Sequence, residues 1–236
     1  FRLLRWILLL IATLALWWVF AHKTGPLPPL GHFFSPFEGF WQNAEDISAK
    51  SNSSLKIAGL KSEASVTYDD RMVPHVFAEN EEDLYFLQGY VTASQRLWQM
   101  DMQVRVAEGR LSEVIGEKLL EKDKEARRIG LKLGAQRSLA FMNLDPKSKM
   151  IAERYAAGVN AWITSLEPKD YPLEYKLLDF KPEAWSPFKT VLLLKYMANM
   201  LTGYEHDFEN TNAVKLLGYN VFDQLTPDFP DSLIDP

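Results

Sequence analysis

The alternation of apolar and polar positions predicts a small β-hairpin at the start of the folded body. From residue 65 to residue 68, small polar side chains alternate with Val66 and Tyr68, which is the period of a half-buried strand. Residues 69–72 read as the turn. A second short strand is expected over 74–78, with Pro74 at its beginning, where a missing N–H is tolerated.

The remaining body has helical periodicity. From Phe86 to Ala107, apolar residues recur in steps of four and three, so we expect a long helix over 81–107 that is apolar on most of its surface and therefore buried. Gly109 lies where a C′ glycine ends a helix. Further helices are expected over 111–115, 119–142, 187–202, 205–217 and 220–225, and a Pro-rich connection over 166–187.

A helix is also expected to begin at Asp145-Pro146, because Asp is a good N-cap and Pro suits the first helical position. Its buried face is predicted to consist of Ile151, Tyr155, Val159 and Trp162.

The N-terminal segment, residues 1–23, has the order of an export signal. Arg2 and Arg5 precede an uncharged run over 6–21, whose helical rise of ~24 Å falls short of the ~30 Å hydrocarbon core. That length fits a secretory signal better than a full span. A signal cleaved after the weak site at 19–21 and a short, uncleaved membrane anchor both remain open.

Residues 24–63 form a linker rich in Pro and Gly, and the Pro-rich tail over 226–236 reads as another. The first linker is too aromatic for a free spacer, so we expect part of it to pack on a membrane surface or on the body. Asn52 begins a glycosylation sequon, which matters only in a eukaryotic secretory route. The aromatic residues of this linker are Phe33, Phe34, Phe37, Phe40 and Trp41.

Composition narrows the choice of function. The chain has 236 residues, 47% of them hydrophobic and 24% charged, as in ordinary globular proteins. Its net charge of −5 offers no basic field for nucleic acid. The absence of cysteine excludes a disulfide, a thiolate zinc site and a cysteine nucleophile within this chain. With no initiator Met and an ending that completes no element, we expect a piece of a longer protein.

Local motifs give little catalytic chemistry. The sequence has no GxSxG, Gly-rich phosphate loop or HExxH motif. The acidic pairs at 69–70 and 81–82 are explained by turn chemistry and by the first turn of a helix. His75 is interpreted as a structural histidine, because no carboxylate or nucleophile partner is evident nearby in the sequence.

Charged residues within the apolar helix over 81–107 predict an ion network. Asp101 and Arg105 are spaced i,i+4 and can pair, but buried charges need further partners. Arg96 belongs to the same apolar helix. We expect a structural network rather than a catalytic one. Its other candidate members are Arg110, Asp123, Arg127 and Arg128.

Several ordered motifs over 64–225 resemble the amino-terminal (α) segment of the penicillin acylase family. They are Val-Pro-His-Val-Phe-Ala at 73–78, Gly-Tyr-Val-Thr-Ala-Ser-Gln-Arg-Leu-Trp-Gln-Met-Asp at 89–101, and Gly-Arg-Leu-Ser-Glu-Val-Ile-Gly at 109–116. Asp123 with Arg127-Arg128, residues 155–163 and Met-Ala-Asn at 197–199 continue the likeness.

The resemblance implies an α+β, mostly helical fragment of the four-layer αββα fold of N-terminal nucleophile (Ntn) hydrolases. Members of this family are exported precursors with a signal, an α segment, a spacer and a β segment. Self-cleavage exposes a Ser at the β N-terminus, which attacks an amide of an N-acylated small molecule. The expected location is periplasmic or extracytoplasmic, with the β segment as partner. β-Lactam side chains, acyl-homoserine lactones and N-acyl amino acids all remain open as substrates.

No catalytic residue is assigned within this chain, which is expected to be inactive alone. Ser51 precedes the first strand instead of starting a β segment, and Ser232 lies in the tail that resembles the start of the spacer. The alternative is a membrane-tethered, catalytically inactive acylase-fold protein that acts as a binding module or scaffold. A weaker third reading is an unrelated helical membrane-surface protein.

Two contributions to function are implied by the resemblance. Met197, Met200 and Leu201 match the part of the family that lines the acyl pocket, and a flexible apolar wall suits that role, although plain core would show the same pattern. Asp207 matches the family's calcium ligand from the α chain, where Glu is usual. Glu205 and Glu209 compete for that assignment, and an ordinary acid at a helix start is the alternative.

Overall fold

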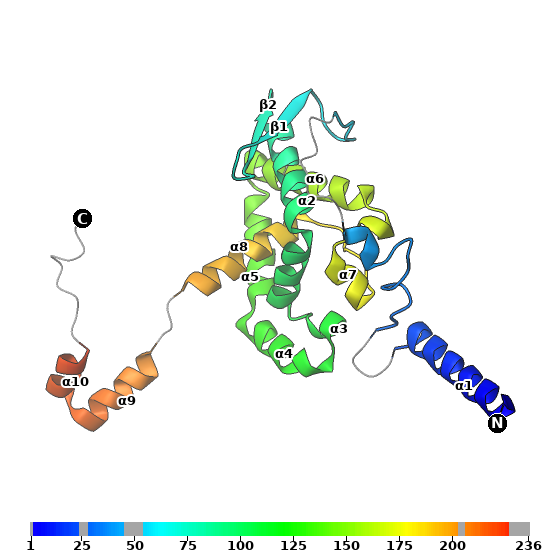
Figure 1. The fold of residues 1–236 in the computed structure, drawn as a ribbon. Coiled ribbons are helices and arrows are strands. Elements are labelled where there is room, and N and C mark those ends of the chain that lie inside the picture. Colours follow the sequence, from blue (N-terminus) through cyan, green and yellow to red (C-terminus); the bar gives the residue numbers. More distant parts are fainter. Residues whose placement is uncertain (1, 24–27, 45–53, 203–205, 227–236) are drawn as a thin grey trace. The chain divides into compact units, whose positions relative to one another are not determined.

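A computed structural model describes residues 2–23, 28–44, 54–202 and 206–226 of the chain (Figure 1). It contains two units, Phe1–Met197 and Ala198–Pro236, so that helix α8 (Pro187–Leu201) crosses from one into the other.

The predicted hairpin is confirmed. Strand β1 (Ala64–Tyr68) pairs antiparallel with β2 (Pro74–Ala78), with Val66 opposite Val76. Met72 takes a left-handed conformation in the connecting turn, with φ of 61°. The two strands are the only sheet among the described residues.

Helix α2 (Glu81–Glu108) is central to the first unit (Figure 1). Its N-cap Asn80 accepts a hydrogen bond from the Asp83 amide, and Gly109 ends it with a φ of 67°, as the sequence predicted. The apolar stripe along α2 is confirmed, because most of its members are buried. These are Phe86, Ala93, Leu97, Met100, Val104 and Ala107.

Helix α6 (Pro146–Ser165) packs along α2 at unusually close range, and its predicted cap, Asp145, accepts from the Ser148 amide. A Cβ on Gly158 would collide with the Phe86 carbonyl, and one on Gly89 with the Tyr155 carbonyl. The predicted buried face of α6 is confirmed in part, because Tyr155 and Trp162 pack on the core although they are not fully buried. Val159 is buried, but Ile151, Tyr155 and Trp162 are only partly covered, because small residues occupy the contact: Ala152, Ala156 and Gly158.

The predicted helix over 119–142 is two helices. Gly130, with φ of 79°, separates α4 (Leu120–Ile129) from α5 (Leu131–Met142), because its left-handed conformation ends the first helix. Before them lie α3 (Ser112–Ile115) and the 3₁₀ turn η2 (Glu117–Leu119).

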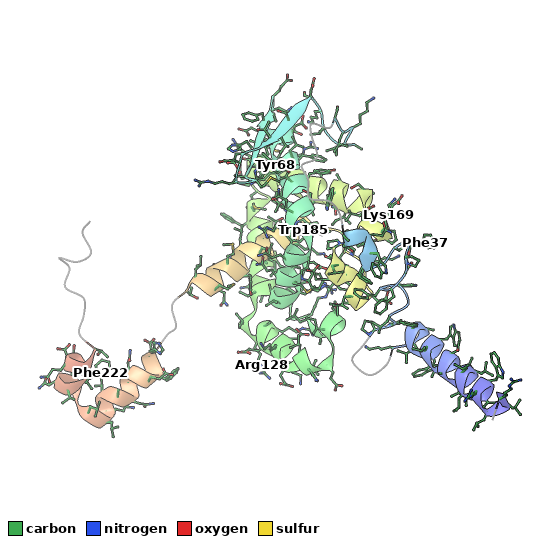
Figure 2. All side chains as sticks on the ribbon, viewed as in Figure 1. Phe37, Tyr68, Arg128, Lys169, Trp185 and Phe222 are labelled. Atoms are coloured by element: carbon green, nitrogen blue, oxygen red, sulfur yellow. The ribbon has the colours of Figure 1, made fainter. Side chains whose placement is uncertain are left out.

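The Pro-rich connection over 166–187 is more ordered than predicted. It contains the 3₁₀ turn η3 (Pro168–Asp170) and helix α7 (Leu173–Leu178). Tyr175 of α7 is fully buried, and Trp185, labelled in Figure 2, is 5% exposed. Together with Val191 and Leu192 from the start of α8, these residues complete the core on α2 and α6.

The second unit contains α9 (Asp207–Leu217) and α10 (Tyr219–Leu225). None of its described residues is buried, and Phe208 and Leu216 are 85% and 84% exposed. The predicted start of α9 at Glu205 lies outside the described residues.

Helix α1 (Arg2–Ala21) has 20 residues and is therefore about 30 Å long, more than the ~24 Å expected from its uncharged part. It is long and apolar enough to cross a membrane, a test that signal sequences also pass. The linker contains the 3₁₀ turn η1 (Phe40–Asn43) and contacts α7, as anticipated for part of this segment.

Candidate functional site

A buried carboxylate joins the hairpin to the two central helices. Asp83 is fully buried and accepts hydrogen bonds from the amides of Lys61 (3.0 Å) and Ser62 (2.9 Å) and from Asn80 Nδ2 (2.8 Å). Arg154 of α6 lies 3.1 Å away. Burial alone would raise the pKa of Asp83, but these donors and the Arg154 charge hold it below its usual value. Sequence reasoning assigned Asp83 no role.

The predicted pair of Asp101 and Arg105 is present, with 3.2 Å between Arg105 Nε and Asp101 Oδ1. Arg105 is 3% exposed, and its two Nη atoms reach Glu113 (3.3 Å) and Glu183 (2.9 Å). Burial raises the pKa of Asp101, against the opposing effect of Arg105. Tyr175 donates to the second Asp101 oxygen at 3.1 Å, and burial also raises the pKa of this phenol, which stays protonated.

Arg110 is part of the same network, as predicted. Its guanidinium contacts Glu183 (2.7 Å), Glu113 (2.8 Å) and Glu108 (2.9 Å). Hydrogen bonds from Arg110 lower the pKa of Glu183 to about 2. These acidic partners were missed by the sequence reading. The available signal was Glu183 itself, a single acid within the Pro-Glu-Ala-Trp-Ser-Pro stretch over 182–187.

Asp123 does not pair with the arginine doublet. It accepts hydrogen bonds from the amides of Leu111 and Ser112, each at 2.8 Å, and so holds the start of α3. Arg127 instead donates to the Gly109 carbonyl at 3.0 Å. The expectation that these residues extend the ion network is wrong, because backbone groups at the α2–α3 turn compete for both side chains.

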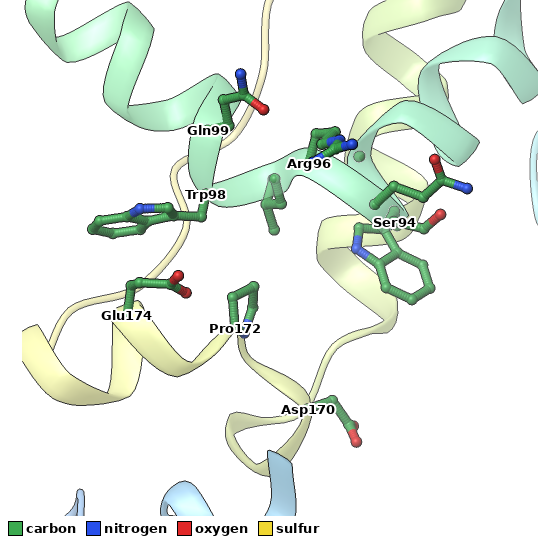
Figure 3. A pocket seen from close by; sticks show the side chains of 11 residues that line it. Ser94, Arg96, Trp98, Gln99, Asp170, Pro172 and Glu174 are labelled. Atoms are coloured by element: carbon green, nitrogen blue, oxygen red, sulfur yellow. The ribbon is translucent and has the colours of Figure 1, made fainter. Parts of the chain in front are cut away.

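Arg96 is exposed, contrary to its expected burial, and has non-helical backbone angles (φ −135°, ψ 17°) that kink α2. It lines a cavity of about 410 Å³ between the kink and the segment over 170–174 (Figure 3). Ser94, the hydroxyl that lines this cavity, donates to the Val91 carbonyl at 2.8 Å. Its proton is therefore engaged by the backbone and not by a general base.

His75 has a carboxylate neighbour that the sequence reading did not find. Its Nε2 lies 3.4 Å from Asp69 Oδ2 across the hairpin, where Asp69 also accepts from the amides of Arg71 and Val73. The pair is well exposed to solvent. Asp69 thus organises the turn, in agreement with the turn chemistry predicted for it.

The three residues expected to line a substrate pocket lie at the end of α8. Met197, Met200 and Leu201 are 56%, 63% and 80% exposed. Val191 and Leu192, at the other end of the same helix, are 4% and 0% exposed. The pocket assignment stays a prediction, which the exposure of these side chains leaves open.

Asp207 begins α9 and is exposed, as is Glu209. Within the described residues no three His, Asp or Glu side chains gather as a metal site. The role of Asp207 as one ligand of a calcium site stays a prediction. Glu205, Ser51 and Ser232 lie outside the described residues.

The polar side chains buried in the first unit share one property, which is complete hydrogen bonding. In the ranges that the structure describes, every buried side-chain nitrogen and oxygen has a hydrogen-bond partner. Such complete pairing holds the packed helices in position. The pairing predicted for Asp101 and Arg105 is confirmed, and the structural role expected of their network stays a prediction.

Comparison with known proteins identifies the class of protein that uses this scaffold. A thermostable penicillin G acylase from Alcaligenes faecalis has a similar solved structure, with a TM-score of 0.60 and 30% sequence identity. The match covers 71% of this chain and 93% of that one. It confirms the expected fold class, a mostly helical fragment of an Ntn hydrolase.

The chain belongs to the penicillin amidase family, whose model matches residues 63–232. It is 35% identical over 148 residues to penicillin acylase 2 proenzyme from a Pseudomonas species, covering 63% of this chain and 19% of the relative. It is 30% identical to penicillin G acylase of Escherichia coli (70% and 21%) and 28% identical to acyl-homoserine lactone acylase QuiP of Pseudomonas aeruginosa (74% and 20%). The chain thus spans about a fifth of the length of these relatives.

Proposed function

We propose that this chain is the α-subunit part of an exported amidohydrolase that cleaves the amide of N-acylated small molecules. The nucleophile would be an N-terminal Ser, exposed by self-cleavage, in a β segment outside this chain. The observation that carries the proposal is the family match over 63–232, together with relatives named as penicillin and acyl-homoserine lactone acylases.

The distribution of apolar surface supports a missing partner. The end of α8 and the helices α9 and α10 present large apolar side chains to solvent, among them Leu201, Phe208 and Leu216, each at least 80% exposed. Exposed apolar patches on this scale mark surfaces that are covered in the working protein. The β segment of the same precursor is the occupant that the family relation favours.

The substrate pocket is proposed to use Met197, Met200 and Leu201 as one wall. All three side chains are exposed at the end of α8, and thioether and leucine groups adapt to apolar acyl chains of different shape. The start of α8 is joined to the ion network through Lys189, whose Nζ lies 3.2 Å from Glu183 Oε2.

Calcium is proposed as a resident ion that Asp207 helps to hold. Calcium takes six to eight oxygen ligands, so the remaining ligands would come from the partner segment. An exposed carboxylate in the first turn of a helix is free to join such a site. The ion would fix the position of α9 against the partner.

The test is expression of the full-length precursor. We expect a self-generated cut that leaves Ser at the new N-terminus, followed by release of free acid from a panel of phenylacetyl amides, acyl-homoserine lactones and N-acyl amino acids. Replacement of that Ser by Ala should abolish both cleavage and turnover. A precursor that remains intact and forms no acyl ester would falsify the proposal and favour a binding or scaffold role.

A further inference from the structure

The segment over 28–44, which we call the aromatic strap, lies outside the stretch matched by the family model. It follows α1 and precedes the hairpin in the chain. Its aromatic side chains stack on one another, with 5.1 Å between the ring centres of Phe33 and Phe40 and 4.2 Å between those of Phe40 and Trp41. The strap is therefore an ordered element that lies outside the stretch matched by the family model.

A buried lysine fastens the strap to the body. Lys176 of α7 is 7% exposed, and its ammonium donates to the carbonyls of Gly39 (3.1 Å) and Lys169 (2.6 Å) and to Asn43 Oδ1 (2.7 Å). Three acceptors satisfy all three ammonium protons. Asn43 Nδ2 also donates to the Tyr171 carbonyl at 3.0 Å.

A second contact ties the other end of the strap to the body, with 3.1 Å between His32 Nδ1 and Asp179 Oδ1. The polar groups of the strap are thus directed to η3 and α7. A nearly buried ammonium group is stable only when its protons are hydrogen-bonded, as those of Lys176 are. The contact between Lys176 and the strap is therefore specific.

The strap also contacts the end of α1. The Gly31 amide donates to the Phe20 carbonyl at 2.9 Å, and the Phe20 and Phe34 rings meet edge to face with 5.7 Å between centres. A Cβ on Gly31 would crowd the Phe20 carbonyl, so the approach needs glycine there. These contacts use residues on both sides of the possible cleavage site at 19–21.

Three aromatic side chains of the strap are also well exposed to solvent. Phe34 is 46%, Phe37 80% and Trp41 58% exposed, and Figure 2 labels Phe37 on this segment. Helix α1 has no buried residue at all, although its mean hydropathy is 2.1. A helix that is apolar all round and uncovered by protein is stable only in hydrocarbon, and aromatic rings concentrate at the membrane–water boundary.

We propose that α1 remains on the mature protein as a membrane anchor, and that the aromatic strap lies in the interfacial layer of a phospholipid bilayer, holding the body at the membrane surface. Helix α1 is about 30 Å long, but its uncharged part covers only ~24 Å, which makes it a short anchor whose first turn, with Arg2 and Arg5, would lie at the cytoplasmic boundary of the hydrocarbon core. This inference does not depend on the amide hydrolysis proposed above.

The test uses the full-length protein in the membranes of the producing cells. A photoreactive benzophenone analogue of phenylalanine is placed at Phe37 or, as a matched control, at Phe141 of α5, which is 78% exposed against 80% for Phe37. After illumination, phospholipid adducts are counted by mass spectrometry. We expect several-fold more lipid adducts at position 37 than at 141, on a protein whose N-terminus still includes α1.

Three results would overturn the inference: equal lipid adducts at both positions, protein adducts in place of lipid at position 37, or a mature N-terminus beginning after Ala21. A second variant tests the fastening. Lys176→Met should increase protease cleavage within 28–44 several-fold in detergent, whereas Lys176→Arg should increase it less. If K176M fails to fold, the adduct comparison still decides the matter. An activity assay on the same material reports separately on amide hydrolysis.

Discussion

The α2–α6 contact and the stretch over 197–226 differ in what completes them. In the first, two helices meet through glycine and alanine, and the charged side chains nearby are paired within the chain. In the second, none of the described residues is buried. The chain thus completes the first interface itself, whereas the second, which we call the unfinished surface, is the one for which we propose a partner.

The contrast is visible within a single helix. The first turns of α8 bury Leu192 completely, while Leu201 at its end is 80% exposed. Both ends are apolar in sequence, so the hydrophobicity of the residues alone does not show which end is buried and which is exposed. What distinguishes them is whether the rest of the chain brings complementary groups to that end.

The largest loss of stability is expected from a substitution that pushes helices α2 and α6 apart. Gly158→Ala places a Cβ against the Phe86 carbonyl, which cannot move aside as a flexible side chain would. We expect a loss of about 3 kcal/mol in the free energy of unfolding, measured by denaturant titration. Gly134→Ala in α5 is the matched control, because nothing lies within 4 Å of its Cβ. It should stabilise by about 0.5–1 kcal/mol. Equal effects of the two would contradict the close approach.

A smaller loss is expected from Glu183→Gln, which removes the charge that Arg105 and Arg110 share. Glu183 is about one-third exposed, so solvent screening limits the loss to about 1–2 kcal/mol at neutral pH. Glu121→Gln, at an exposed pair with Lys124, should change stability by less than about 0.5 kcal/mol.

The loss at Glu183 should depend on pH in one direction. The pKa of Glu183 is about 2 in the folded protein, below the ordinary value of ~4.3 for a glutamate. Its negative charge therefore stabilises the folded protein at pH values above ~4.3. That contribution disappears as the pH falls from ~5 towards 2. Thermal unfolding curves of wild type and E183Q should therefore converge over this range. A constant difference would show that the charge is not responsible.

The unfinished surface should respond in function more than in folding. Leu201→Ala removes apolar area from the proposed pocket wall, and we expect about a tenfold loss in kcat/KM for a long acyl substrate. Leu194→Ala is the control, since Leu194 is also exposed (61%) on α8 but outside the proposed wall. Steady-state kinetics on the processed full-length enzyme distinguish them. A similar loss in both would assign these residues to plain packing.

The smallest effect is expected at Asp207. If it holds one corner of a calcium site, chelation should lower the unfolding temperature of the wild-type full-length protein by a few degrees and that of Asp207→Asn by less. Glu209→Gln should keep the wild-type response. If chelation lowers the unfolding temperature of D207N as much as that of the wild type, the calcium ligand is another acidic residue.

The sequence predicted the elements whose signals are local. The alternation in the hairpin, the stripe on α2 and the cap at Asp145 each depend on residues close together in the chain, and all three were confirmed. The end of α4 at Gly130 was not predicted, because the sequence does not show whether a glycine within a helical run adopts a left-handed φ. The buried face of α6 was predicted only in part, because the distance between α2 and α6, set by Gly89 and Gly158, decides which side chains are fully covered.

The candidate site was predictable only in part, for a related reason. The Asp101–Arg105 pair is local, but its partners Glu183 and Tyr175 lie more than seventy residues away. Periodicity carries no information about such contacts. Met197, Met200, Leu201 and Asp207 remain predictions because their expected partners lie outside this chain.

The carboxylate of Asp83 has a consequence for how the molecule opens. It binds the backbone just before β1, the cap of α2 and, through Arg154, helix α6. Detachment of the segment that leads into β1 therefore disturbs both helices. Amide hydrogen exchange should accordingly be as slow in β1 as at the start of α2, making this short ribbon part of one cooperative unit instead of a loose flap.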